Sequence, residues 1–225
     1  MFNGTAVNIF VVLSWLVLPE TKPASAAAGS AKPKADGVFR SFGRIFRNKT
    51  GAVVLLSGFA LYDVFYTLIV FLPAILQSQY GLSAAQIGMF PLLFMGLSLV
   101  GSKLSGKLQS RLQPGTMLVL TGAAVGISLI VFLFAASLSL LALGVSLAIT
   151  GFVSGLMMPA LPTLLTAEFV QERATAIGVY NFVRYVGMAA APMIGSILYP
   201  LGGIPLLIGV TAVLIGFSSL FAARR

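Results

Sequence analysis

The sequence predicts an all-α membrane protein, a polytopic bundle of helices that cross the bilayer. Of its 225 residues, 58% are hydrophobic and only 8% are charged, and its mean hydropathy is +1.02. Soluble domains carry about 25% charged residues, so this chain lacks the charge to cover a surface that faces water. After residue 50 it holds apolar segments long enough to cross a bilayer, which takes about 20 residues. Six such segments are expected, at about 51–77, 85–105, 116–136, 139–166, 174–199 and 203–222.

The residue types that the chain lacks exclude several classes of chemistry. It has no Cys and no His, so disulfides, thiolate chemistry, imidazole bases and the common zinc sites are excluded, and we expect neither a metal nor a cofactor. No Ser/Lys or paired-Asp arrangement lies at matched depth, so we expect no enzyme of the intramembrane hydrolase class. In a membrane protein the net charge of +9 reports orientation, and no nucleic acid partner is expected.

Residues 1–18 contain an apolar run, 5–18, that is shorter than a comfortable span. A secretory signal peptide is one interpretation, because Ala24-Ser25-Ala26 resembles a cleavage site. However, no Lys or Arg precedes the run, and a signal peptide begins with basic residues. We therefore expect a partial transmembrane helix here, either clipped or missing its upstream part.

Residues 19–50 form a basic linker, and its part rich in Pro, Ala and Ser, 23–33, is expected to be flexible. Residues 38–48 place Phe side chains on one face of a helix and Arg side chains on another. That pattern is typical of a helix lying on a lipid surface, and an ordinary basic loop is the alternative. The two sets are Phe39, Phe42 and Phe46 against Arg40, Arg44 and Arg47.

Basic residues mark every second connection between the six segments. The links near 78–85, 136–139 and 199–204 contain no charged residue, whereas the other connections and the C-terminus carry Lys and Arg. The positive-inside rule then places the linker and the C-terminus in the cytoplasm. We expect a multi-pass protein of the cell (plasma) membrane, and its short loops favour a bacterial inner membrane.

Two charged residues of opposite sign lie at matching depth in different segments. Asp63 is about twelve residues into the 51–77 segment, or ~18 Å at about 1.5 Å per residue, and Arg184 lies ~16 Å into the 174–199 segment from the same side. Both therefore reach the middle of the bilayer. The segments at 116–136 and 203–222 have no ionisable residue inside and are expected to face lipid at the periphery.

Asp63 and Arg184 each have functional and structural interpretations. Asp63 can take up and release protons during transport, or hold a cationic group of a substrate beside Tyr62 and Tyr66. Arg184, with Asn181 one turn away on the same face, can bind an anionic group or tune Asp63. The structural alternative is an ion pair between Asp63 and Arg184 that fixes helix packing.

Further candidates lie in and after the 139–166 segment. Glu168, Glu172 and Arg173 stand at its cytoplasmic end, where they are either solvated charges or a gate that contacts another cytoplasmic loop. Glycines and prolines are expected to break the segment itself. Broken helices often form transporter sites, but Gly and Pro are also common in membrane helices generally. The residues concerned are Gly151, Gly155, Pro159 and Pro162.

Short motifs across the chain resemble those of one transporter family. The apolar run ending in Leu18-Pro19-Glu20-Thr21, followed by a basic linker, resembles the close of a sixth helix and a central loop. A basic loop motif runs over residues 106–112 and includes Gly106, Ser110 and Arg111. A glycine and proline spacing follows, with Gly178, Gly187, Pro192 and Gly195, and Glu172-Arg173-Ala174 precedes it.

With these motifs, the chain resembles the C-terminal half of a major facilitator superfamily transporter, from the end of helix six through helix twelve. The drug/proton antiporter branch is the most similar. In that branch Asp often stands at the position of Ser110, and glycines stand where this chain has Ala191 and Ser196. The resemblance implies a six-helix half of the major facilitator fold plus one N-terminal helix remnant.

The resemblance also implies a function and a cavity. In the family the substrate cavity lies between two six-helix halves, which puts Asp63, Tyr66, Asn181 and Arg184 on or near it, with Tyr62 beside them. We expect a proton-coupled exporter of a small amphipathic compound or drug, an antiporter of the multidrug-resistance type, present as a half or truncated transporter. Its partners would be the lipid bilayer, substrate, protons, and a missing N-terminal half or a second copy. The alternative is a non-transporting half-fold that acts as a scaffold or partner subunit.

Overall fold

The computed structural model describes residues 35–224, and within them every element is helical. The partial helix expected at residues 1–18 and the flexible part of the linker lie outside the described residues. The chain divides into two compact units, Met1–Gly37 and Val38–Arg225, and all the apolar helices belong to the second. The elements are α2 (Ala35–Arg47), α3 (Lys49–Tyr80), α4 (Ala84–Gln109), α5 (Pro114–Leu138), α6 (Leu140–Met157), α7 (Ala160–Glu168), η1 (Val170–Glu172) and α8 (Arg173–Ala223).

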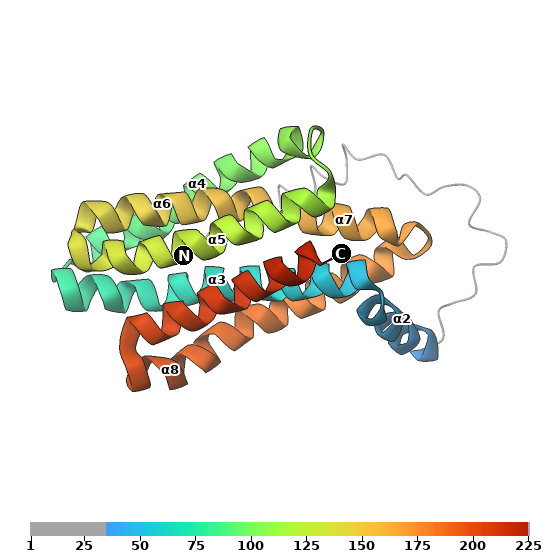
Figure 1. Ribbon diagram of the computed structural model, residues 1–225. Coiled ribbons are helices and arrows are strands. Elements are labelled where there is room, and N and C mark those ends of the chain that lie inside the picture. The colour runs from blue at the N-terminus through green and yellow to red at the C-terminus, as the bar shows by residue number, and fades with distance from the viewer. Residues whose placement is uncertain (1–34, 225) are drawn as a thin grey trace, which may run out of the picture. The chain divides into compact units, whose positions relative to one another are not determined.

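Five helical stretches among the described residues are long and apolar enough to cross a membrane, which confirms the expected all-α membrane bundle. The last of them contains two of the predicted segments. It turns back at Gly202 and Gly203, whose backbone is not helical, so that a first limb (173–201) and a second limb (204–223) of α8 run in opposite directions (Figure 1). Gly203 has φ of 63°, a conformation that favours glycine.

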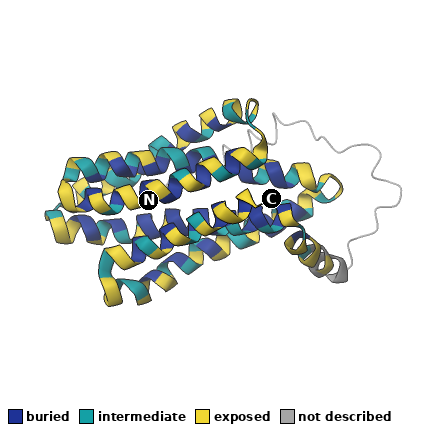
Figure 2. Ribbon diagram, in the orientation of Figure 1, coloured by how far each residue is buried: buried dark blue, intermediate teal, exposed yellow. Residues whose placement is uncertain are grey.

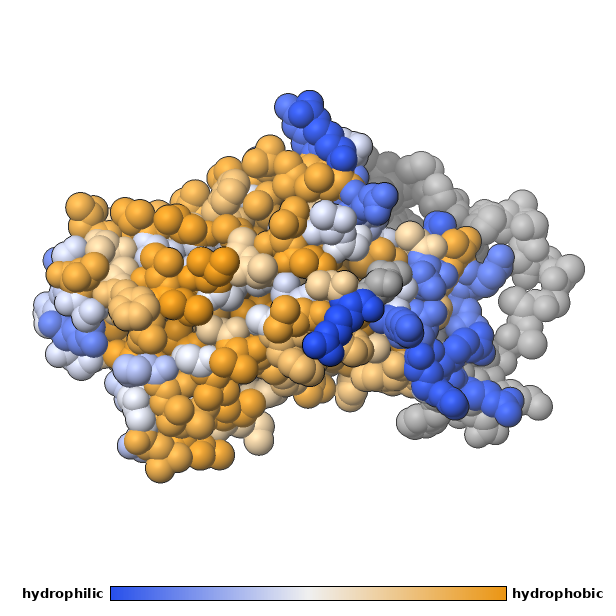
Figure 3. Space-filling model, in the orientation of Figure 1, coloured by the Kyte–Doolittle hydropathy of each residue, from blue (hydrophilic) through white to orange (hydrophobic). Residues whose placement is uncertain are grey.

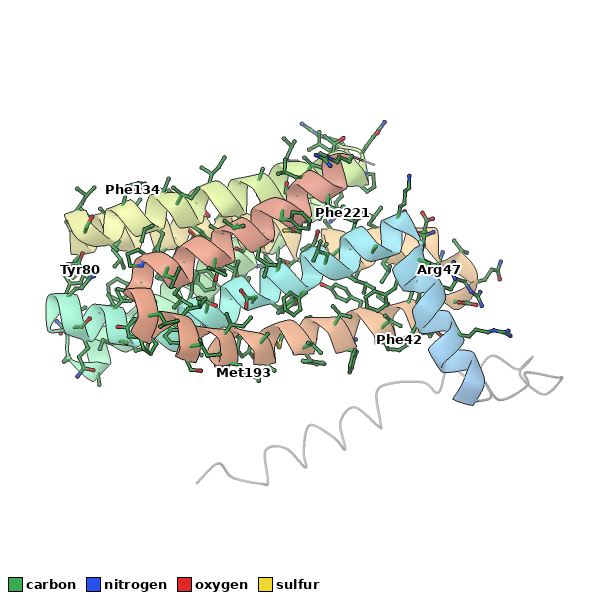
Figure 4. The ribbon with its side chains drawn as sticks, turned by 60° about the horizontal axis from the view of Figure 1, so that its bottom comes forward. Phe42, Arg47, Tyr80, Phe134, Met193 and Phe221 are labelled. Atoms are coloured by element: carbon green, nitrogen blue, oxygen red, sulfur yellow. The ribbon has the colours of Figure 1, made fainter. Side chains whose placement is uncertain are left out.

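Each helix packs on a small number of neighbours. Helix α3 packs chiefly on α8, α4 packs on α6, and α5 packs on both α6 and α8. Buried side chains line the faces that turn toward one another, while the outer faces are exposed (Figure 2). Phe134 of α5 and Met193 of α8, 65% and 68% exposed, point away from the bundle (Figure 4). Outer faces of this kind suit contact with lipid or with another protein.

Glycines allow α4 and α6 to approach each other closely. A Cβ atom on Gly101, Gly151 or Gly155 would run into backbone atoms of the partner helix. The hydroxyl of Ser105 on α4 also donates a hydrogen bond to the carbonyl of Leu156 on α6 (2.7 Å). Small residues at contact positions are how membrane helices come close without a hydrophobic driving force.

The interruption in the 139–166 segment is therefore at one place. Helix α6 continues through both glycines and ends at Met157, and α7 begins after Pro159. The expectation that Gly151 and Gly155 break the helix is wrong, because these residues serve contact with α4. The ring of Pro159 and its missing N–H explain the interruption that does occur.

Charged side chains gather at one end of the helices, which we call the charged end (Figure 3). It comprises the junction of α2 and α3, the α4–α5 connection, the α7–η1–α8 connection and Arg224, the last residue that the structure describes. The connections at the other end, 81–83, 139 and 202–203, carry no charge. This separation follows the alternation of charge along the sequence.

Candidate functional site

The two neighbouring residues Tyr62 and Asp63 of α3 contact different limbs of α8. Asp63 is 4% exposed, and its carboxyl group lies near the side chain of Thr211 on the second limb. Tyr62 contacts Arg184 on the first limb. Successive residues of a helix are rotated by about 100°, so adjacent side chains point in different directions.

Arg184 is held between two tyrosines. Its guanidinium carbon lies 4.9 Å from the ring centre of Tyr62 and 4.9 Å from that of Tyr185, within the range of a cation–π interaction. Its Nη1 donates to the hydroxyl of Tyr62 (3.3 Å) and its Nη2 to that of Tyr185 (3.2 Å). Its Nε is buried and has no hydrogen-bond partner among the described residues.

Equal depth does not bring the two charges together. Within residues 35–224, Asp63 and Arg184 form no ion pair, and each has its own polar neighbours. The structural alternative of an Asp63–Arg184 pair therefore has no support in this conformation. Instead, Asp63 has Thr211 as its neighbour and Arg184 has Tyr185, and neither neighbour was predicted from the sequence.

Tyr66 and Asn181 are the remaining candidates for the substrate cavity. Tyr66 lies one turn after Tyr62 on the same face of α3 and is 37% exposed. Asn181 is half-buried on α8, three residues before Arg184. Neither side chain forms a hydrogen bond within the part of the chain that the structure describes. Asn181 is therefore about one turn from Arg184 on the first limb of α8.

Close packing fixes α3 against the first limb of α8. A Cβ on Gly187 would lie 2.5 Å from the carbonyl oxygen of Phe59, and one on Gly195 would meet the ring of Phe71. By contrast, Gly178 is exposed with open space around it, and Pro192 is half-buried. Gly187 and Gly195 of the glycine motif thus set the distance between the helices that carry Tyr62 and Arg184.

At the charged end, α2 and the start of α3 contact the α7–η1–α8 connection. Arg44 Nη1 donates to Glu172 Oε1 (2.6 Å), and Asn48 Nδ2 donates to Glu168 Oε1 (3.0 Å). The ring of Phe42 packs edge-on against Phe182, with ring centres 5.8 Å apart. Two of the candidate gate residues therefore contact another segment.

The other sequence candidates at this end lie apart from these contacts. Arg173 is exposed. In the loop motif, Gly106 has open space around it, Arg111 is exposed, and the Ser110 hydroxyl donates to the carbonyl of Lys107 (2.8 Å). Asn48 was not singled out from the sequence, although a polar residue that precedes a long apolar helix is a recognisable N-cap signal.

A protein-family model matches the chain. The model of the Major Facilitator Superfamily matches residues 1–192. No curated protein matches the chain. No group of three potential metal-ligating side chains lies within residues 35–224. The family match covers most of the chain and agrees with the helical bundle, so the chain belongs to the Major Facilitator Superfamily and is a multi-pass protein of a family of membrane transporters, not of enzymes.

Proposed function

We propose that the chain is a secondary active transporter, or half of one, that exports a small amphipathic compound in exchange for protons. The observation that carries this proposal is the burial of Asp63 without a paired cation. Asp63 is the only charged residue that is buried among the described residues, and it lies in the middle of α3 with no cation paired to it there. Ionisable residues within membrane helices commonly serve as proton carriers or ion sites. A change in its protonation would alter its contact with Thr211.

The position of Asp63 supports coupling between proton binding and helix movement. Its neighbour Thr211 is on the second limb of α8, while Tyr62 in the preceding position contacts Arg184 on the first limb. A charged carboxylate in this apolar setting is costly, and its protonation removes that cost. Proton exchange would therefore change how α3 packs between the two limbs, next to the proposed substrate residues Tyr62, Tyr66, Asn181 and Arg184.

The charged end is proposed to face the cytoplasm of a bacterial inner membrane, because basic residues concentrate there. Glu168, Glu172 and Arg173 are proposed as a cytoplasmic gate. The bonds from Arg44 to Glu172 and from Asn48 to Glu168 support this role, because they join the segment before α3 to the start of α8. These contacts would have to change if the segment before α3 moved relative to the start of α8.

The substrate cavity is proposed to form where the outer faces of α3, α4 and the first limb of α8 meet six further helices, from an N-terminal half or from a second copy of the chain. The exposed apolar side chains on α4 support such a partner, because an apolar surface of this extent needs protein or lipid to cover it. Among them are Met89, Leu92 and Leu99. We also propose that the chain belongs to the drug/proton antiporter branch, because its short sequence motifs resemble those of that branch.

The coupling role is tested in everted membrane vesicles from cells that express the full chain. The vesicles are energised, and a pH-sensitive dye records proton release when ethidium, chloramphenicol or a naphthalene sulfonate is added. Asp63→Asn is expected to abolish the compound-dependent proton signal, because an amide cannot carry the proton. Asp63→Glu should retain part of it. Asp36→Asn, the same change in α2 outside the spanning helices, is the matched control.

Full proton exchange in Asp63→Asn vesicles that contain normal amounts of protein would refute the coupling role. A wild-type chain that moves no protons with any of the compounds would favour the alternative of a scaffold or partner subunit.

A further inference from the structure

We propose that Arg184 binds an anionic group of the transported compound, so that the substrate class is an organic anion with an apolar, preferably aromatic, body. This inference rests on the proposed function and specifies the substrate of the same site. The sequence left open whether the cavity presents Asp63 to a cationic group or Arg184 to an anionic one. The structure distinguishes the two residues by their exposure and by their neighbours.

Asp63 does not face an open surface. Only 4% of it is exposed, and its side chain lies near Thr211 between α3 and the second limb of α8. Arg184 is half-buried on the first limb, and its neighbour Tyr185 is 56% exposed. A ligand that approaches the face shared by α3 and the first limb therefore meets the guanidinium group and not the carboxylate.

The positive charge of Arg184 has no counterion among the described residues. Besides Asp63, the acidic residues whose side chains the structure describes are Glu168 and Glu172, which lie at the charged end and bond to Asn48 and Arg44. The two groups that contact Arg184 are tyrosines, which disperse the charge without neutralising it. Charged residues at membrane depth usually pair with an opposite charge or line a wet cavity. An anion delivered by the substrate would satisfy this requirement.

The hydrogen bonds of Arg184 leave donors free for such an anion. A guanidinium group has five N–H donors. Nη1 and Nη2 each use one on a tyrosine hydroxyl, at 3.3 and 3.2 Å, so each keeps a second N–H. Two terminal nitrogens with one free N–H each form the fork that a carboxylate accepts with both oxygens. The two rings hold this fork in a fixed orientation.

The surroundings of the fork are aromatic. Two of its contacts are tyrosine rings, those of Tyr62 and Tyr185, and Tyr185 is 56% exposed. Tyr66, one turn after Tyr62 on α3, is 37% exposed. The guanidinium charge of Arg184 makes contact of this surface with lipid unfavourable. The rings offer contact area to an apolar ligand body, while a ligand cation would be repelled by Arg184. The site should therefore prefer an anion to a neutral molecule, and a neutral molecule to a cation.

Three planar molecules of almost the same shape test the preference: benzoate, benzamide and benzamidine, which carry a negative charge, no charge and a positive charge. Their binding to the purified full chain in detergent micelles is measured by equilibrium dialysis against empty micelles. We expect benzoate to bind at least about tenfold more tightly than benzamide, since a charge-assisted pair is worth that much or more. Benzamidine should bind most weakly.

Arg184→Gln is expected to bring benzoate down to the affinity of benzamide, and Arg184→Lys to keep part of the preference. Arg224→Gln removes an exposed charge at the C-terminus and should leave all three affinities unchanged. If Arg184→Gln does not fold, Tyr185→Phe provides the test, because it keeps the ring and removes one of the two hydroxyls that orient the fork. It should weaken benzoate binding severalfold and leave benzamide unaffected.

Equal affinity for the three molecules, tighter binding of benzamidine, benzoate binding that is insensitive to these variants, or no binding at all would each overturn the proposal. Equilibrium dialysis measures binding without transport, so it tests the anion site independently of the proposed transport function. Benzoate binding without proton exchange in vesicles would refute only the transport function, and proton exchange with ethidium but no benzoate binding would refute only the anion site.

Discussion

Gly155→Ala is expected to weaken the contact between α4 and α6 on which the bundle depends. The added Cβ would lie 2.7 Å from both the Cα and the carbonyl carbon of Ser98, and nearer still to its carbonyl oxygen. These are backbone atoms of a long helix, so no side chain can rotate away to make room. Ordinary contact begins at 3.4 Å, so the two helices must separate by at least 0.7 Å, the difference between 3.4 and 2.7 Å.

The expected cost follows from comparing two effects. Forcing one extra carbon into a packed interior costs about 1–3 kcal/mol. Replacing Gly by Ala in a helix normally gains about 0.5–1 kcal/mol. In a micelle, however, the unfolded chain keeps its helical hydrogen bonds, because its backbone has no other partner there. The helix-propensity gain then largely cancels, and a loss of about 1–3 kcal/mol in the free energy of unfolding remains.

The measurement is unfolding of the purified full chain by SDS in mixed micelles, followed by circular dichroism and by size-exclusion chromatography. Gly144→Ala is the matched control, since it makes the same change on the same helix. Its Cβ would lie 3.7 Å from the nearest atom, Cε1 of Phe90, which is ordinary contact. We expect its stability to stay within about 0.5 kcal/mol of the parent chain. Equal stability of the Gly155→Ala and Gly144→Ala variants would show that the backbone contact at Gly155 does not limit how closely α4 and α6 pack.

Three further changes test other contacts by the same unfolding measurement. Tyr80→Phe removes the hydrogen bond from its hydroxyl to the carbonyl of Ala136 (2.7 Å) near the end of α5, and should cost about 0.5–1.5 kcal/mol; no measurable change would mean that water replaces it fully. The ion pair of Arg44 and Glu172 has side chains 59% and 29% exposed, so a double-mutant cycle should give a coupling below about 1 kcal/mol; a coupling of several kcal/mol would show a buried pair instead. Asn48→Ala removes the side-chain cap of α3 and should cost about 0.5–2 kcal/mol, unlike Asn48→Asp, which keeps the capping oxygen; equal losses in both variants would locate the effect in the bond to Glu168.

The spans could be predicted from the sequence because length and hydropathy are local properties. The turn chemistry at residues 81–83 and 202–203 and the interruption at Pro159 were visible in the same way. Glycines in α6 were harder to interpret, since a glycine that loosens a helix and one that admits a neighbouring helix look the same in one sequence. Only the neighbours of Gly151 and Gly155 show that they are contact positions.

The composition, the apolar segments and the alternation of charged connections therefore determined that this is a membrane bundle, and they located Asp63 and Arg184 at equal depth. Depth follows from counting residues along one helix, at about 1.5 Å for each. The direction in which a side chain points around its helix, relative to other helices, depends on contacts between segments far apart in the chain. The tertiary structure alone places Asp63 near Thr211 and Arg184 between Tyr62 and Tyr185, because these positions depend on how α3 packs against both limbs of α8. The close approach of α3 to the first limb at Gly187 sets the spacing of the helices that carry Tyr62 and Arg184.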